Sequence, residues 1–246
     1  MAETGRFVPL VIAVQFLTRL PVSPGGQVSD EQVGLSVLLY PLVGLGIGAI
    51  LFVVAIFCAS ASVFVAAALV VTGWVLLTGA LHLDGLADCA DAWIGALNSP
   101  VRSLEIMKDP CVGPVAVSIL VLQLLLKYSA VVALLQSHMP GVLLWAPAVG
   151  RTIVIAAILW IPYIRPDGLG AVLVKTTPRM PARCLVFVVC LLVLLQLGVT
   201  TLLACVLVFI TLRALLMDRL GGATGDAYGA LIECIETTVL IMPLFL

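Results

Sequence analysis

Three aspartates gather at the end of one apolar run, in the segment HLDGLADCAD at residues 82–91. Asp84, Asp88 and Asp91 are spaced i, i+4 and i+7, which places their carboxylates on one stripe of a helix. Close anions repel one another, so the stripe becomes favourable when a divalent cation lies among them. Oxygen ligands suit Mg²⁺, which also keeps waters and shares its shell with substrate phosphates. The spacing predicts a magnesium site with Asp84 and Asp88 at the catalytic centre; a solvated helix end is the alternative.

His82 lies just before this stripe, almost opposite Asp84 on a continuous helix. It joins the site as a catalytic proton acceptor only if Gly85 marks a break in the helix. Without that break, the alternative is a structural histidine at the membrane interface.

A second polar segment, RSLEIMKDPCVGP, covers residues 102–114. Glu105 and Asp109 are spaced i, i+4 and would offer further metal ligands, while Arg102 and Lys108 would bind substrate phosphate. The alternative is an amphipathic surface helix with its own ion pairs. The functional interpretation is a lip beside the metal site.

A third segment, GGATGDAYGALIECIE, covers residues 221–236. Gly222 and Gly225 belong to a flexible turn whose backbone N–H groups would face an anion at the start of a helix. Asp226 and Glu233 are seven residues apart and share a helical stripe. Carboxylates in an apolar helix are costly and usually functional. We therefore expect Asp226 to be a metal ligand or base and Glu233 to be a further metal ligand.

Two cations lie near the middle of apolar runs, where each needs a partner or a wet cavity. Arg151 is predicted to hold a substrate phosphate through its forked guanidinium, with an ion pair to one of the acids as the alternative. Lys127 is less readily assigned to the site, because a lysine side chain can extend to the interface.

The surrounding composition defines the class of protein. The 246 residues are 63% hydrophobic and 10% charged, with a mean hydropathy of +1.26. Such values predict an all-α, polytopic membrane protein, a single integral membrane domain at residues 1–246 with about six or seven transmembrane helices. The expected apolar segments are 34–59, 62–83, 113–136, 141–163, 184–217 and 229–246, together with the shorter 7–22, which is either a span or an interfacial helix.

Residues 184–217 are too many for one ordinary span of ~20 residues, and Gly198 is predicted to begin a tight turn that makes them a hairpin. With this hairpin, the loops at 22–33, 84–112, 164–183 and 217–228 all lie on one side. The loops on the other side, near residue 60, at 137–141 and at 198–201, have no Lys, Arg, Asp or Glu. The distribution of basic residues predicts that the polar side is cytoplasmic.

Several motifs, in this order and spacing, resemble the cobalamin synthase family, also called the adenosylcobinamide-GDP ribazoletransferases. The resemblance covers nearly the whole chain. The motifs are LTRLPVSP (17–24), YPLVGLGIG (40–48), GALHLDGLADCADAW (79–93), LEIMKDPCVGP (104–114), RPDGLG (165–170) and GGATGDAYGALIECIE (221–236).

The resemblance implies a Mg²⁺-dependent enzyme of late cobamide assembly, multi-pass in the cell inner membrane with its active face in the cytoplasm. The substrates would be adenosylcobinamide-GDP and α-ribazole or its 5′-phosphate, and the products adenosylcobalamin or its phosphate and GMP. The lipid bilayer is the expected surrounding and nucleic acid is not an expected partner. A homo-oligomer, or association with other late cobamide-assembly enzymes, is left open.

Two other functions stay open at this stage. A CDP-alcohol phosphotransferase also uses clustered aspartates in membrane helices, but its usual pattern has an AR pair after DG, and here no arginine follows Gly85 until Arg102. A cation transporter would use acids near the bilayer centre, and most acids of this chain lie toward one face.

Overall fold

The computed structural model describes residues 7–97, 99–166 and 169–245. Within these ranges the regular elements are helices, with one isolated β-bridge between two loops. In chain order they are α1 (Val8–Leu17), α2 (Asp30–Val37), α3 (Tyr40–Phe57), α4 (Val63–Thr78), α5 (Leu81–Gly95), α6 (Pro100–Ile106), α7 (Pro114–Gln136), α8 (Val142–Trp160), α9 (Leu169–Thr176), α10 (Arg179–Leu220), α11 (Gly225–Ile241) and η2 (Met242–Phe245). The predicted all-α class is confirmed.

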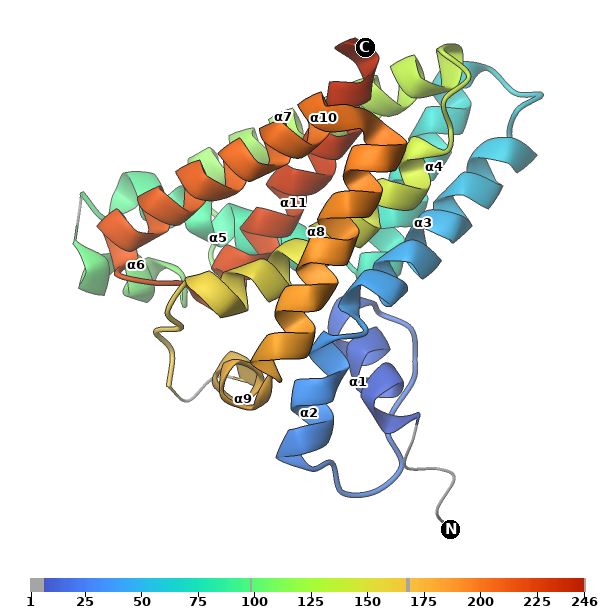
Figure 1. The fold of residues 1–246 in the computed structure, drawn as a ribbon. Coiled ribbons are helices and arrows are strands. Elements are labelled where there is room, and N and C mark those ends of the chain that lie inside the picture. Colours follow the sequence, from blue (N-terminus) through green and yellow to red (C-terminus); the bar gives the residue numbers. More distant parts are fainter. Residues whose placement is uncertain (1–6, 98, 167–168, 246) are drawn as a thin grey trace.

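In the described part of the chain, five helices are long and apolar enough to cross a membrane, or up to six if α4 and α5 form one bent span. α10 has 42 residues but leaves helical geometry at Gly198, where φ is 85°. Figure 1 shows the chain changing direction sharply there, near the C-terminus. The predicted hairpin is therefore confirmed, with its break at one glycine. Treating the two arms of α10 as separate crossings adds one, giving the expected six or seven.

The junction between α4 and α5 differs from the prediction. Gly79 and Ala80 have φ angles of 60° and 58°, in the left-handed region that glycine adopts most readily. The two helices consequently meet at an angle of 86°. The single span predicted at residues 62–83 is wrong at its end, because the span stops at Thr78 and His82 belongs to α5.

The N-terminal part is also more divided than the sequence suggested. The segment expected as one span at residues 34–59 is split between α2, which ends at Val37, and α3, which begins at Tyr40. α1 has 10 residues, about half of the ~20 that a crossing requires. α1 is therefore too short to span the membrane as a single straight helix.

α8 is the central helix of the bundle, because 83% of its apolar 18-residue stretch is buried inside the protein. Glycines on α3 allow its backbone to approach. A Cβ atom added at Gly44 would lie 2.5 Å from the carbonyl oxygen of Pro147, and one added at Gly48 would lie 2.6 Å from that of Leu144. Without side chains at these positions the two helices pack backbone to backbone, as small residues permit in lipid.

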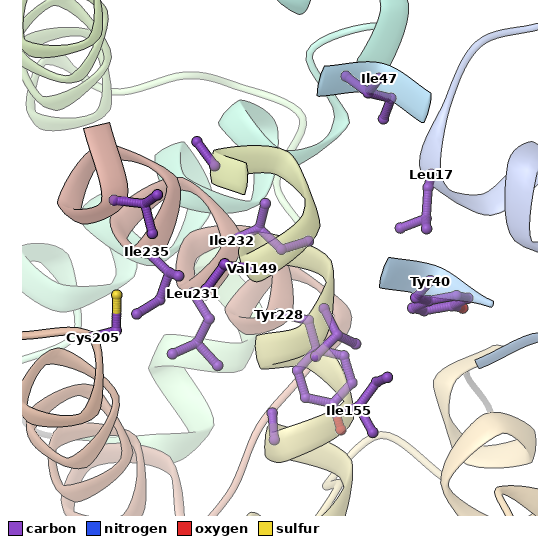
Figure 2. Packing of buried hydrophobic residues seen from close by; sticks show 14 of the residues in the cluster. Leu17, Tyr40, Ile47, Val149, Ile155, Cys205, Tyr228, Leu231, Ile232 and Ile235 are labelled. Atoms are coloured by element: carbon purple, nitrogen blue, oxygen red, sulfur yellow. The ribbon is translucent and has the colours of Figure 1, made fainter. Parts of the chain in front are cut away.

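The other side of α8 holds α11 in place. Figure 2 shows Leu231, Ile232 and Ile235 of α11 beside Val149 of α8, and all four side chains are buried in the same hydrophobic cluster. Close packing of this kind leaves little freedom to rotate or slide. The beginning of α11, which carries Asp226, is thereby fixed beside α5.

Candidate active site

α5 and α11 cross at two glycines, far apart in the sequence. A Cβ atom added at Gly85 would lie 2.6 Å from the backbone oxygen of Asp226, and one added at Gly229 would lie 3.2 Å from the Cα atom of His82. Only residues without a side chain permit so close an approach. The crossing brings the acids of α5 next to Asp226, as the predicted topology required.

Three carboxylates surround this crossing. Asp84 is exposed, whereas Asp88 and Asp226 are partly buried. Asp88 is close enough to Asp84 and Asp226 for each of them to disfavour its negative charge. Such mutual repulsion is relieved by a cation, and the magnesium role expected of the aspartate stripe stays a prediction.

Asp91 has a different environment from the other two members of the stripe. Its two carboxylate oxygens accept hydrogen bonds from the backbone N–H groups of Gly113 and Ala116, at 2.6 Å and 2.9 Å. These N–H groups belong to the start of α7, where a carboxylate also meets the positive end of the helix dipole. Asp91 thus joins α5 to α7, and its predicted role as a metal ligand competes with this capping role.

Arg165 is the cation that contacts the crossing. Its Nη1 atom lies 2.8 Å from Oδ2 of Asp226, and the two side chains are 25% and 22% exposed. In the sequence, Arg165 is one of several basic residues in a loop that is predicted to be cytoplasmic, and charge pattern alone does not distinguish it from the others. Its motif, RPDGLG, was the available signal; residues 167 and 168 of that motif lie outside the described residues.

Backbone hydrogen bonds fix the position of the main chain from which the Arg165 side chain extends. The N–H of Ala223 donates to the carbonyl oxygen of Pro162 at 2.8 Å, and the N–H of Ile164 donates to that of Ala223 at 3.1 Å. Gly222 packs against Pro162 and Ile164 so closely that a side chain would not fit. Gly222 is therefore a packing residue of this turn, whereas Gly225 is exposed at the start of α11 and its predicted contact with an anion stays a prediction.

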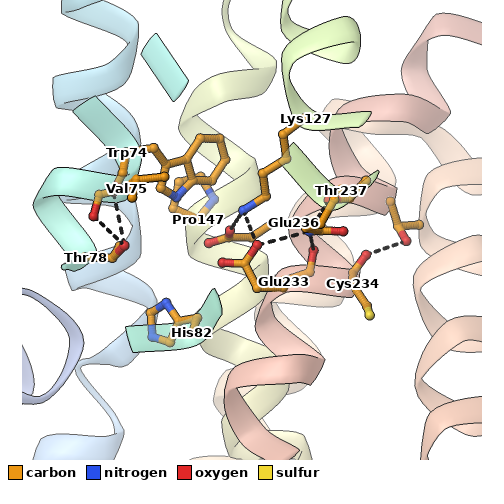
Figure 3. Close-up of polar contacts among 12 residues, drawn as sticks. Trp74, Val75, Thr78, His82, Lys127, Pro147, Glu233, Cys234, Glu236 and Thr237 are labelled. Atoms are coloured by element: carbon orange, nitrogen blue, oxygen red, sulfur yellow. Dashed lines mark hydrogen bonds and ion pairs between the residues drawn. The ribbon is translucent and has the colours of Figure 1, made fainter. Parts of the chain in front are cut away.

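A second charged cluster lies deeper, among α7, α8 and α11. Nζ of Lys127 lies 2.7 Å from Oε2 of Glu233 and 2.5 Å from Oε2 of Glu236, and Arg151 pairs with the other oxygen of Glu236. Figure 3 shows Lys127 reaching these two acids. The side chains of all four charged residues are at most 4% exposed. Two acids here match two bases. For Arg151 the geometry therefore favours the ion-pair alternative over phosphate binding, and Glu233 is committed to Lys127 rather than free for a metal.

His82 belongs to this deeper cluster. Its Nδ1 atom lies 3.4 Å from Nη2 of Arg151, and its side chain is buried. α5 is a continuous helix from Leu81 to Gly95, so the break at Gly85 on which a catalytic His82 depended is not there. We therefore leave His82 out of the acid–base residues.

The predicted lip is formed by α6 and the turn after it. Arg102 and Glu105 form an exposed ion pair at 2.9 Å, as the surface-helix alternative expected. Asp109 accepts a hydrogen bond from the backbone N–H of Cys111 at 2.9 Å, and this bond lowers the pKa of the Asp109 carboxyl. Lys108 is exposed. These side chains are available to a ligand at the surface, but their metal and phosphate roles stay predictions.

The fold and the crossing together define a class: a multi-pass helical membrane protein with excess carboxylates and an arginine at one end of its bundle. Within the described ranges, no group of three or more His, Cys, Asp or Glu is arranged to hold a metal ion by itself. The model of the cobalamin-5-phosphate synthase family matches residues 9–244, and the chain belongs to this family.

Curated relatives agree with this membership along their whole length. The adenosylcobinamide-GDP ribazoletransferase of Stutzerimonas stutzeri (strain A1501) is 49% identical over 240 residues, covering 95% of this chain and 96% of the relative. The protein of the same name from Pseudomonas syringae pv. syringae (strain B728a) is 47% identical over 237 residues, covering 95% and 98%. No solved structure matches the chain.

Proposed function

We propose that this chain transfers the adenosylcobinamide phosphate of adenosylcobinamide-GDP to α-ribazole or its 5′-phosphate, in the assembly of cobalamin. The names of its relatives support this reaction. One structural observation carries the proposal: among the described residues, the α5–α11 crossing has three carboxylates and one partnered arginine. A charge excess of this sign is suited to a cation that accompanies a diphosphate.

The reaction exchanges one phosphorus–oxygen bond for another. The ribose 3′-hydroxyl oxygen of α-ribazole attacks the corrinoid-side phosphorus, the bond from this phosphorus to GMP breaks, and the hydroxyl proton passes to a base. Asp84, Asp88 and Asp226 are the acids placed for that role, since each is near the crossing and none is held in the deep cluster. A base placed within hydrogen-bond reach contributes typically ~10²–10⁴-fold to such a step.

The residues of the crossing fit Mg²⁺ that arrives with the diphosphate. Mg²⁺ commonly takes one or two protein carboxylates and completes its shell with water and substrate phosphates, so a preformed cage is not required. Asp84, Asp88 and Asp226 would supply the carboxylates. Within the described part of the chain, Nε and Nη2 of Arg165 are buried without a hydrogen-bond partner, as donors awaiting an oxyanion would be. A bound ion would neutralise charge on the diphosphate oxygens.

In this proposal, the basic residues of the surface lip attract the anionic substrate to the site. Lys108 and Arg102 are exposed on the element next to α5, and would attract the anionic substrate and hold its outer phosphate. Glu105 and Asp109 stay weaker metal candidates, because Glu105 is paired with Arg102 and Asp109 already accepts a backbone N–H. Arg151, Glu233 and His82 are left out.

We further propose that this end of the bundle faces the cytoplasm, in the cell inner membrane. The absence of Lys, Arg, Asp and Glu from the opposite loops supports this orientation. Cysteine introduced at Ser23, in a background without native cysteines, should react with an impermeant reagent only from the cytoplasmic side. Cysteine at His138 should react only from the other side; both positions are exposed. The reverse pattern would contradict the orientation.

The reaction itself is tested with purified protein in liposomes. Adenosylcobinamide-GDP, α-ribazole and Mg²⁺ should yield a cobalamin product and GMP in equal amounts, separated by chromatography, and omission of α-ribazole should prevent both. Turnover of CDP-activated lipid precursors instead would support a CDP-alcohol phosphotransferase. Cation flux without nucleotide would support a transporter, whose expected deep acids are neutralised here by Lys127 and Arg151.

A further inference from the structure

Arg165 uses only part of its hydrogen-bonding capacity. Nη1 donates to Asp226 at 2.8 Å, while Nε and Nη2 are buried and have no partner among the residues that the structure describes. Buried donors without partners are rare because each costs free energy. A guanidinium presents its N–H groups in a fork that matches two oxygens of a phosphate. The unused donors of Arg165 therefore point to an oxyanion as the ligand that completes them.

The position of Arg165 is set by structure, not by the attraction of Asp226 alone. Residues 162–164 are paired through their backbone with Ala223, directly before the turn that leads into α11. The side chain thus starts beside the α5–α11 crossing whether or not it bonds to Asp226. A guanidinium at this distance can change its acceptor by rotation about side-chain bonds, without displacement of a helix.

Arg165 also supplies positive charge to more than one acid. Its guanidinium lies 2.8 Å from Asp226, where a positive charge offsets the repulsion between Asp226 and the acids of α5. A divalent cation at the crossing would perform the same electrostatic task. The guanidinium and a metal ion accordingly compete for one carboxylate, Asp226.

We propose that Arg165 is a placeholder cation that exchanges Asp226 for the diphosphate when substrate and metal enter. In the free chain it occupies the Asp226 carboxylate. When the diphosphate of the corrinoid substrate arrives with its divalent cation, the Arg165 donors pass to phosphate oxygens and Asp226 is released to the metal. This inference rests on the proposed function. It makes metal and diphosphate binding mutually supportive, and the coupling must be reciprocal.

Manganese provides the probe, because free Mn²⁺ is counted directly by electron paramagnetic resonance. Without substrate, the Arg165→Gln variant should bind Mn²⁺ on the order of tenfold more tightly than the unaltered chain, since Asp226 no longer has a competing partner. Arg165→Lys keeps the charge and should stay close to the unaltered chain. Arg183→Gln removes an exposed cation without an ion pair to these acids among the described residues, and should leave Mn²⁺ binding unchanged.

The second measurement adds adenosylcobinamide-GDP without α-ribazole, so that no turnover occurs. The substrate should tighten Mn²⁺ binding to the unaltered chain by about 5–150-fold, the usual range of such couplings, and by much less in Arg165→Gln. Asp226→Asn placed in the Arg165→Gln background should remove the gain seen without substrate. Melting curves of each variant establish that it is folded.

Two results would overturn the exchange: Mn²⁺ binding to Arg165→Gln that is no tighter than to the unaltered chain, or a gain that survives Asp226→Asn. If no variant binds Mn²⁺, the exchange is likewise wrong. The proposed function is judged separately, by cobalamin formation in liposomes. Turnover with no Mn²⁺ gain refutes only the exchange, whereas a Mn²⁺ gain with no turnover refutes only the reaction.

Discussion

α11 carries two charged clusters about two turns apart, and they differ in balance. The deep cluster pairs Glu233 and Glu236 with Lys127 and Arg151, two acids with two bases. The cluster at the α5–α11 crossing sets three acids against one partnered arginine. The deep side chains are nearly free of solvent, whereas Asp84 is exposed.

The difference indicates that the deep charges hold the fold, and in the proposed function the charges at the crossing are the ones that would meet a ligand. A charge deep in a membrane protein is costly unless it is paired there, so an imbalance at that depth would oppose folding. Near the surface, water can solvate the excess carboxylates, and the proposed Mg²⁺ would replace part of that water. Acids of the same helix thus have different tasks, and the count of opposite charges around each one indicates which.

The largest expected effect is on stability, in the deep cluster. Glu236→Gln would leave Lys127 with a single acid and Arg151 with none, and breaking a buried pair on one side typically costs ~3–5 kcal/mol. The melting temperature of the purified protein should fall clearly, while Glu105→Gln, at an exposed ion pair, should leave it nearly unchanged. A variant as stable as the unaltered chain would mean that the deep cluster is not structural.

At the crossing the expected effect is on turnover. Asp88→Asn keeps size and removes charge, and should reduce the rate by ~10² or more, as removal of a preorganised electrostatic partner commonly does. Its melting temperature should change little. Asp91→Asn is the comparison on the same helix: its amide oxygen can keep one of the two N–H bonds to α7 and its NH2 group loses the other, so it should lower the melting temperature and largely keep turnover. Equal losses in both variants would restore all three aspartates to one metal site.

A smaller loss is expected from geometry alone. A Cβ atom at Gly85 would meet the backbone of Asp226 at 2.6 Å to 3.1 Å, so Gly85→Ala must move α5 away from α11. Turnover should fall about tenfold through misplacement of the acids, without loss of any charge. Gly46→Ala is the matched control, since nothing lies within 4 Å of a Cβ atom there. Similar rates for both variants would show that the close crossing is not needed.

The smallest effect is expected at the lip. Arg102 is part of an exposed pair, so Arg102→Gln should change stability by less than ~1 kcal/mol. If this arginine attracts the diphosphate, KM should rise a few-fold at low salt and return to the unaltered value at high salt, where exposed charges are screened. A KM that does not respond to salt would remove Arg102 from substrate binding.

The sequence was sufficient for the features that depend on long-range pattern. Hydropathy and the one-sided distribution of charge predicted the hairpin at Gly198 and placed Asp226 on the same side as Asp84. A magnesium role for the acids was a prediction from spacing and stays one. Helical spacing predicts which residues share one face of a helix, but it does not predict which residue of another element contacts each of them.

The failures follow from that limit. Asp91 shares a stripe with Asp88, yet the start of α7 takes its carboxylate. Arg165 lies in a loop, so it belongs to no helical pattern that could group it with the acids. Backbone pairing between loops that are distant in the sequence brings it to Asp226. The bend before α5 depends on a left-handed backbone conformation at Ala80, and an alanine in a sequence does not predict that conformation.

The crossing of α5 and α11 also sets an order of events while the protein itself is being translated and inserted into the membrane. α5 is made early and meets the membrane with its acids uncompensated, while its partner follows only after residues 96–224 have been translated and inserted. Until then Gly85 of α5 lacks the α11 backbone against which it packs. Assembly of the site therefore waits for the hairpin of α10, which delivers α11. A nascent chain interrupted before this point would hold every aspartate of α5 and still lack Asp226 and the α5–α11 crossing.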